Sequence, residues 1–137
     1  MRKTNMKNSL TLTLINVDTN GVSIFSEKTV GLSARGGMNI SDQLPTLSCR
    51  LRTSAANYSS DWHVAGDPTL ILIQQGKLRI YLQDNSYKDF GSGDYFVAQD
   101  ALADDVIFDP KRHGHRAEVL GEQALQAVHV KLAKRIY

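Results

Sequence analysis

Residues 69–82 have the sequence TLILIQQGKLRIYL, in which two short apolar runs flank the pair Gln75-Gly76. Leucine and isoleucine fill the first run, and apolar residues alternate with basic or aromatic ones in the second. Short runs of this kind, separated by a turn signal, predict two consecutive β-strands.

Similar runs recur along the whole chain, and turn residues such as Gly, Asn, Asp and Pro separate them. No window keeps an apolar period of 3.6 residues for three turns, as an amphipathic helix would. We therefore predict an all-β domain, built as an antiparallel sandwich or barrel. The expected strands are SLTLTLIN (9–16), VSIF (22–25), TLSCRLR (46–52), TLILIQ (69–74), KLRIYL (77–82), DYFVA (94–98), HRAEVL (115–120) and ALQAVHVKL (124–132).

Length and charge exclude several classes of protein. A chain of 137 residues is expected to form one domain with a sizeable core. Its 16 basic and 14 acidic residues give a net charge of +2, too balanced to predict a nucleic-acid or membrane partner. The one cysteine, Cys49, excludes an internal disulfide, and we expect it to be a small buried apolar residue.

The ends and the loops carry further expectations. Residues 1–9 are predicted to be a loose arm, or an edge strand that a partner subunit borrows, ahead of a single domain at 10–137. The start of the chain lacks the unbroken apolar stretch of a signal peptide, so we expect a soluble cytoplasmic protein. Exposed β edges need covering, and a homodimer is therefore expected.

Residues 99–114 form the longest stretch without a clean strand. They are expected to be a functional or mobile loop. Alternatively, a short strand at 106–108 interrupts this loop.

Two stretches resemble the motifs of the cupin superfamily, small β-barrels made of two facing antiparallel sheets. The first motif, G-x5-H-x-H-x3,4-E-x6-G, aligns its last glycine with Gly76 and its first histidine with His63. Its second histidine falls on Ala65 and its glutamate on Thr69. The second motif, G-x5-P-x-G-x2-H-x3-N, is similar to the segment around Pro110 and His115, where the motif glycine and asparagine fall on Arg112 and Val119.

Further details resemble a subgroup of small bacterial cupins without an assigned function. These details are Trp62-His63 with Ala65, Phe90-Gly91 with Gly93-Asp94, Gly114-His115, and Gly21, Ser23 and Phe25. An insertion lengthens the loop between the motifs, since sixteen residues separate Gly93 from Pro110. The resemblance spans about residues 20–132 and implies a cupin-type jelly-roll barrel.

The resemblance also implies a place for a metal ion inside the barrel. Histidine and carboxylate ligands suit Fe, Mn, Ni or Zn. Of the ligands in the two motifs, this chain keeps His63 and His115. His113 lies two residues before His115, so in an extended segment both imidazoles would share a face. His63, His113 and His115 are therefore the candidate metal ligands.

The alternative is a pocket without a complete metal site. His63, Thr69, Ile71 and Ile73 are expected to face inward by parity, and with His115 they would line a site for a small molecule. Arg50 and Arg52 share one face of their predicted strand; an arginine there could hold a carboxylate, whereas the other interpretation is a solvated outer face. His129 is expected at the surface or in an interface.

Two classes of function remain from the sequence. The first is a small-molecule-binding cupin without a metal cofactor, and the second is a metal-dependent oxygenase or isomerase that uses His63, His113 and His115. Whether the protein is an enzyme stays open at this point.

Overall fold

A computed structural model describes residues 7–137, and every regular element in this range is a β-strand. Six strands form the larger sheet in the order β2-β1-β9-β6-β11-β5, and three form a second sheet in the order β10-β7-β8. Neighbours are antiparallel except β1 and β9, which run parallel. The strands are β1 (Ser9–Val17), β2 (Ser23–Gly31), β3 (Ser33–Arg35), β4 (Met38–Ile40), β5 (Thr46–Ser54), β6 (Thr69–Gln75), β7 (Lys77–Tyr81), β8 (Tyr87–Phe90), β9 (Tyr95–Ala98), β10 (Arg116–Leu120) and β11 (Leu125–Leu132).

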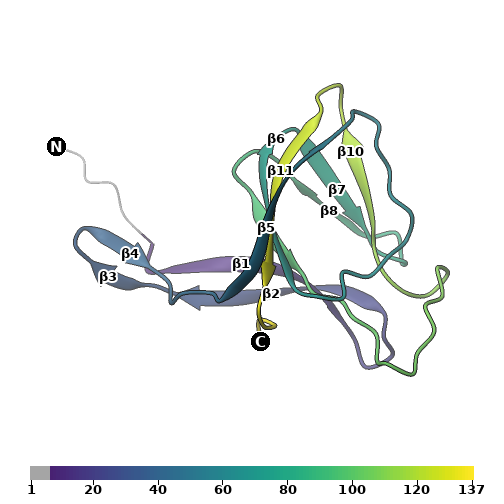
Figure 1. Cartoon of the computed structure of the whole chain (residues 1–137), viewed down its shortest axis with the longest axis horizontal. Helices are drawn as coiled ribbons and strands as arrows, with labels where there is room; N and C mark the ends of the chain where they lie inside the picture. Colours follow the sequence, from purple (N-terminus) through teal and green to yellow (C-terminus); the bar gives the residue numbers. More distant parts are fainter. Residues whose placement is uncertain (1–6) are drawn as a thin grey trace.

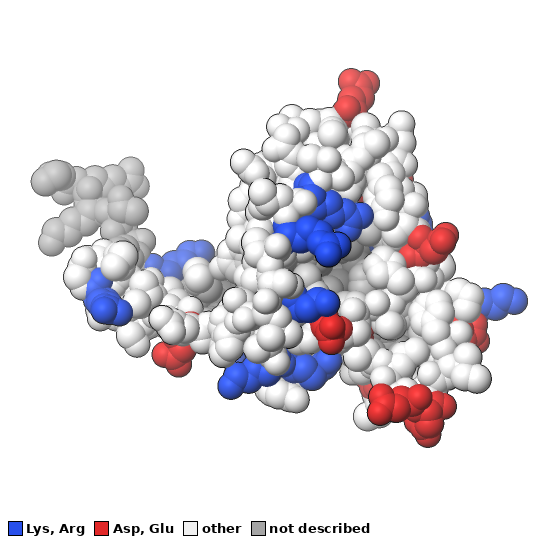
Figure 2. Space-filling view, in the orientation of Figure 1, with Lys and Arg blue, Asp and Glu red and all other residues white. Residues whose placement is uncertain are grey.

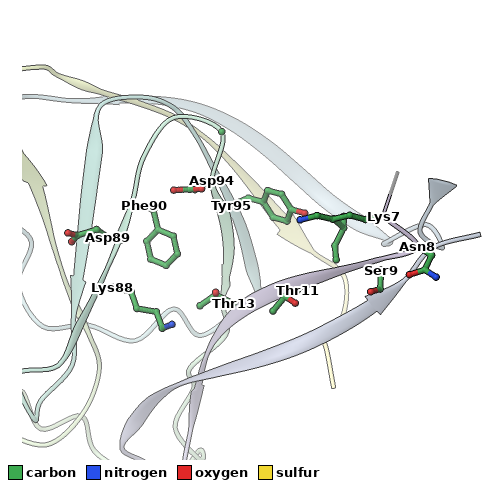
Figure 3. Close-up of a pocket in the computed structure, with 12 residues that line it drawn as sticks. Lys7, Asn8, Ser9, Thr11, Thr13, Lys88, Asp89, Phe90, Asp94 and Tyr95 are labelled. Atoms are coloured by element: carbon green, nitrogen blue, oxygen red, sulfur yellow. The ribbon is translucent and has the colours of Figure 1, made fainter. Parts of the chain in front are cut away.

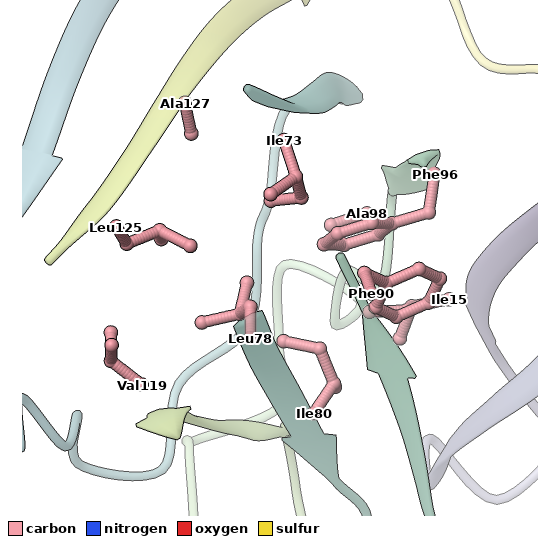
Figure 4. Packing of buried hydrophobic residues seen from close by; sticks show 10 residues of the cluster. All are labelled: Ile15, Ile73, Leu78, Ile80, Phe90, Phe96, Ala98, Val119, Leu125 and Ala127. Carbon is pink, nitrogen blue, oxygen red and sulfur yellow. The ribbon is translucent and has the colours of Figure 1, made fainter. Parts of the chain in front are cut away.

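The main core lies between the two sheets (Figure 4). The larger sheet contributes Phe96, Ile15 and Ile73, of which Phe96 and Ile15 are fully buried. The smaller sheet contributes Leu78 and Phe90, and the Phe90 ring stacks on Phe96 with centroids 4.2 Å apart. The alternation seen in the sequence places these residues on facing sides of the sheets, so the predicted all-β, two-sheet fold is confirmed.

Gly76 allows the chain to turn sharply between β6 and β7. Its φ of +88° is in the left-handed region, and a Cβ there would lie 2.9 Å from the carbonyl oxygen of Ala124. Glycine is therefore the residue that allows β6 to continue directly into β7 of the other sheet. The sequence predicts two consecutive strands here, and the structure places them in different sheets.

Three short strands were not expected from the sequence. β8 has the sequence YKDF, in which two charged residues interrupt the aromatic ones. β3 and β4 have only 3 residues each, and such short segments carry too little alternation to be recognised. They pair with each other as a two-stranded ribbon that projects away from the two sheets (Figure 1).

The ends and the long loop also differ in part from the expectation. β1 begins at Ser9, whereas residues 1–6 of the predicted arm lie outside the described range. Residues 106–108 form no strand and are exposed. Among the described residues there is no helix with the length and apolarity to cross a bilayer.

Cys49 is exposed, contrary to the prediction of a buried side chain. It lies on β5, which is the last strand of the larger sheet. Eight of the nine residues of this strand are exposed, because no other described strand covers either its free edge or its outer face.

Gly114 is expected to be a sensitive position for stability. Its φ is +83°, and a Cβ would lie 2.5 Å from the carbonyl oxygen of His63. Gly114→Ala should therefore lower the free energy of unfolding by more than the ~1–2 kcal/mol of left-handed strain alone, as measured by urea denaturation. Gly93→Ala is the control, since Gly93 has a similar φ of +89° but no atom near the added Cβ. Equal losses in both variants would contradict the close approach of Gly114 to His63.

Candidate functional site

His63 and His115 lie side by side, although 51 residues separate them in the sequence. Their backbones form an isolated antiparallel bridge, in which His63 N donates to His115 O at 3.0 Å and His115 N donates to His63 O at 2.9 Å. The imidazole centroids are 4.5 Å apart. The bridge joins the loop before β6 to the segment that leads into β10, and so fixes both histidines at one end of the space between the sheets.

The carboxylate of Asp100 positions the imidazole of His115 through a hydrogen bond. This carboxylate is completely buried just after β9. Its Oδ2 accepts hydrogen bonds from His115 Nδ1 at 2.8 Å and from Ser23 Oγ at 2.7 Å, and its Oδ1 accepts one from Ala65 N at 3.0 Å. Burial on its own raises the pKa of Asp100, but the hydrogen bonds from His115, Ser23 and Ala65 and the charge of His115 lower it by more, so that the net pKa is below its ordinary value.

These contacts fix which ring nitrogen carries the proton in the neutral form of each imidazole. A carboxylate or a carbonyl oxygen can only accept, so His115 Nδ1 carries the proton that it shares with Asp100. His63 Nδ1 likewise donates to the carbonyl oxygen of Asp61 at 2.8 Å. The Nε2 atom of each ring is therefore left with a free lone pair, able to accept a hydrogen bond or a proton.

Partial burial lowers the pKa of His63, and the charges of His115 and Arg52 act in the same direction. The hydrogen bond to Asp61 and the charge of Asp100 oppose this shift without cancelling it. His63 is accordingly neutral near pH 7, with its basic nitrogen free.

A cavity of about 80 Å³ opens beside the two histidines, between the sheets. Its apolar walls include Ile71 and Phe96 of the larger sheet and Leu78 and Ile80 of the smaller one. Its polar groups, besides the two histidines, are Arg52, Tyr58, His129, Ser54 and Ser60. Apolar walls with a few convergent polar groups are typical of small-molecule sites.

A second hollow of about 190 Å³ adjoins this cavity, and His129 lines both. The sequence-predicted Arg50 and Thr69 lie in this second hollow rather than beside the histidines. For Thr69, the reason for the separation from His63 is the turn at Gly66, whose φ is +72°. This turn interrupts the strand between His63 and Thr69, so parity cannot be counted through it.

The other predicted residues divide between the cavity and the core. Ile71 lines the cavity as expected. Ile73 is buried in the core, with 2% of its surface exposed. His129 is half-buried beside the cavity rather than at the surface, because its strand has β5 and β6 on both sides and its side chain lies on the inner face.

His113 does not join the pair of histidines. Its ring lies near Gly21 and Phe108, and its Nδ1 accepts a hydrogen bond from Asp109 N at 2.9 Å. The residue between the two histidines explains this, since Gly114 is in the left-handed region and the segment is not extended there. Extended-strand parity therefore does not hold between positions 113 and 115.

The residues present do not fit the metal site that the sequence resemblance implies. Catalytic zinc sites use three protein ligands as a rule, and only His63 and His115 meet here. Over residues 7–137 there is no group of three or more His, Cys, Asp or Glu side chains placed to hold a metal ion. Of the three histidines predicted as metal ligands, only His63 and His115 line this cavity.

A wider cleft of about 860 Å³ lies elsewhere, between β1 and β8 (Figure 3). Thr11 and Thr13 of β1 and Lys88 and Phe90 of β8 line it. It contains neither histidine of the pair, and Asp89 at its rim is already bound to Arg79 by two hydrogen bonds of 2.7 and 3.0 Å. The smaller cavity at the histidines is therefore the better candidate site.

Comparison with known proteins gives a likeness of fold. No protein-family model matches the chain, and no curated protein matches it. Among solved structures, the polyketide cyclase RemF from Streptomyces resistomycificus has a TM-score of 0.47 at 17% identity, and the match covers 69% of this chain and 59% of the cyclase. A cupin superfamily protein from Desulfitobacterium hafniense has a TM-score of 0.45 at 19% identity, covering 75% of this chain and 84% of that protein. The cupin domain of Cnp3 from Schizosaccharomyces pombe has a TM-score of 0.48 at 10% identity, covering 94% and 90%.

The two-sheet arrangement of strands stands on the structure itself, and no family follows from likenesses of this size. Likenesses at this level of identity concern the arrangement of strands alone, so the activities of these proteins are not carried over. The structure brings together the two histidines at the positions that resemble the motifs, whereas Ala65 packs against the core and Thr69 donates a hydrogen bond to the Asp67 carbonyl oxygen.

Asp100 is the site residue that sequence analysis missed. It follows the strand DYFVA directly in the run FVAQD, and an acidic residue there looks like an ordinary turn residue. Its role depends on Ser23 and His115, which are 77 and 15 residues away. No local pattern reports contacts over such separations.

Stability should depend on pH through His63 and His129. Burial lowers the pKa of both side chains, and the charges of Arg52 and Arg50 lower that of His129 further. Both are then neutral in the fold but take up protons on unfolding below about pH 6.5. The free energy of unfolding should therefore fall as the pH is lowered from 7 to 5, as measured by urea denaturation at each pH. The double variant His63→Gln, His129→Gln should show a shallower fall, and an unchanged slope would contradict this assignment.

Proposed function

We propose that this protein binds a small molecule in the cavity between its sheets, against His63 and His115. The observation that supports the proposal is the pair itself. Two imidazoles have their Nδ1 atoms engaged by Asp61 and Asp100, while their Nε2 atoms are left for a ligand. Such preorganised polar groups over apolar walls favour binding, because little ordering remains to be done when the ligand arrives.

The size of the cavity limits the ligand. A buried water needs about 15 Å³ of such space, so a cavity of about 80 Å³ has room for roughly five groups of that size. His115 is buried and His63 is exposed at the opening. A ligand would therefore enter past His63 and reach His115 at the inner end.

The proposal is tested with a set of fragments of two to eight non-hydrogen atoms, comprising alcohols, amides, amines and carboxylates. The signals of the imidazole Cε1–H groups are followed by NMR. We expect saturable shifts at His63 and His115 for at least one fragment class. Ala117→Phe should abolish these shifts, because Ala117 lines the cavity and the larger ring would fill it.

Thr11→Phe is the matched control, since it adds the same ring to the separate cleft at β1. Its response to the fragments should equal that of the wild type. Absence of any saturable shift, or shifts that persist in Ala117→Phe, would contradict binding in this cavity.

We also propose that two copies of this chain associate through the outer face of the larger sheet. This face carries two rows of apolar cross-strand neighbours. One row runs Leu51, Val128, Leu72, Tyr95, and the other runs Cys49, Val130, Leu70, Val97, Leu14. The C-terminal Ile136 packs at the β1 end of this face, but Leu51 remains 80% exposed and Leu72 36% exposed.

A second copy is the occupant that these features favour. The part of the rows that stays uncovered crosses β5, β11 and β6, or about 10 Å at the usual spacing of strands, because Val97 and Leu14 are already buried within the chain. This part alone is smaller than the roughly 800 Å² that each partner contributes to a standard interface. The projecting β3–β4 ribbon can supply more area, and a two-stranded ribbon is only marginally stable in water without such packing. An isologous dimer would cover the same patch on both copies.

The dimer is tested by sedimentation at tens of micromolar protein. The wild type should sediment at twice the 15.2 kDa mass of one chain, and Leu51→Lys with Leu72→Lys should sediment at the single mass. Ile107→Lys is the control, because Ile107 is 88% exposed but lies on the 99–114 loop, away from this face. A monomeric wild type would contradict the proposal.

A further inference from the structure

Four basic side chains share the inner face of β5 and β11. Arg50 and Arg52 come from β5, and His129 and Lys131 from β11. Arg50 lies directly opposite His129 in the register of the two strands. Figure 2 shows basic side chains gathered over this part of the larger sheet, beside the hollow between the sheets.

This basic cluster, Arg50, Arg52, His129 and Lys131, lacks acidic partners at the cavity. Neither hollow has an Asp or Glu among its lining residues. Within residues 7–137, only Lys131 of the four forms an ion pair, with the exposed Asp67 at 3.3 Å. The charges of Arg50 and Arg52 therefore have no acidic neighbour at the two hollows, and a bound anion would supply the missing counter-charge.

Arg52 is placed to meet a ligand in the cavity of the two histidines. Its Nε donates to Ser54 Oγ at 3.2 Å, and its guanidinium carbon lies 5.4 Å from the centroid of the Tyr58 ring. Among the described residues no other hydrogen bond holds this side chain, so its two terminal nitrogens are free. Its charge also lowers the pKa of both His63 and His129, which places Arg52 within electrostatic reach of each of them.

We propose that the ligand of this cavity carries a carboxylate, which binds the free guanidinium nitrogens of Arg52, while the rest of the ligand lies between Ile71 and the His63–His115 pair. This inference rests on the proposed small-molecule function and names the chemical class of its ligand. Guanidinium and carboxylate groups match in shape and charge, and they form paired hydrogen bonds. Arg50 and Lys131, in the second hollow, add positive charge along the way in.

A neutral ligand of the same shape would bind more weakly for a definite reason. It would leave the guanidinium groups of Arg52 and Arg50 without a counter-charge, and an ion pair near a protein surface is stronger than one in bulk water. A carboxylate would also raise the pKa of His129, because an opposite charge favours the protonated imidazole. The groups that face His129 are Arg50 and Arg52 on β5, Lys131 on its own strand, the uncharged Thr69 and Ile71 on β6, and Tyr58 from the loop.

The test compares butanoate with butanamide, which have nearly the same shape and differ in charge. Affinities are measured at low salt by NMR titration of the imidazole signals of His63, His115 and His129. We expect butanoate to bind at least tenfold more tightly than butanamide and to raise the pKa of His129. Arg52→Met should remove the preference, and Arg52→Lys should keep only part of it, because the ammonium group cannot form the paired hydrogen bonds.

Arg112→Met is the control for a general loss of positive charge, since Arg112 is exposed on the 99–114 loop. It should leave the preference unchanged. Equal shifts by butanoate and butanamide, or a preference that survives Arg52→Met, would overturn the carboxylate inference while leaving the small-molecule site in place. No shift at the histidines from either compound would overturn this inference, whereas the proposed function fails only when the whole fragment set leaves those signals unmoved.

Discussion

The buried carboxylate of Asp100 is the group on which the arrangement of the site depends. It accepts hydrogen bonds from Ser23 at the start of β2, from Ala65 in the loop before β6 and from His115 just before β10. A buried charge is costly unless its hydrogen-bonding capacity is satisfied, and here three segments that are distant in sequence satisfy it together. The position of His115, and through the backbone bridge that of His63, follows from this requirement.

The two faces of the larger sheet have different chemistry, although the same strands form both. On the inner face, apolar residues such as Phe96 and Ile73 pack against the smaller sheet, while basic residues gather near β5. On the outer face, rows of apolar residues continue as far as Leu51 at the edge. Strand alternation produces this division, because residues two apart point the same way. The proposed ligand site and the proposed surface for association therefore lie on opposite sides of one sheet.

The departures from the cupin motif change the charge of the site as well as its ligand count. A carboxylate at position 69 and an imidazole at position 65 would favour a cation between the sheets. This chain has Thr69 and Ala65 instead, and the neighbouring strands contribute Arg52 and His129. The absence of the acidic ligand and the presence of Arg52 support the anionic ligand proposed above over a divalent cation. The His63–His115 pair is common to both arrangements, which is why the motif alone does not distinguish between them.

The sequence by itself determined the longer strands but not β3, β4 and β8, since period-two runs with glycine turns are local signals, and residues 69–82 show them clearly. Its resemblance to the cupin motifs also selected His63 and His115 as candidate site residues, which the structure places side by side. Tertiary structure alone decided that Asp100 supports His115, that His129 faces a cavity and that His113 does not. These outcomes depend on hydrogen bonds between distant segments and on left-handed glycines at positions 66 and 114, which interrupt the alternation on which counting by parity relies.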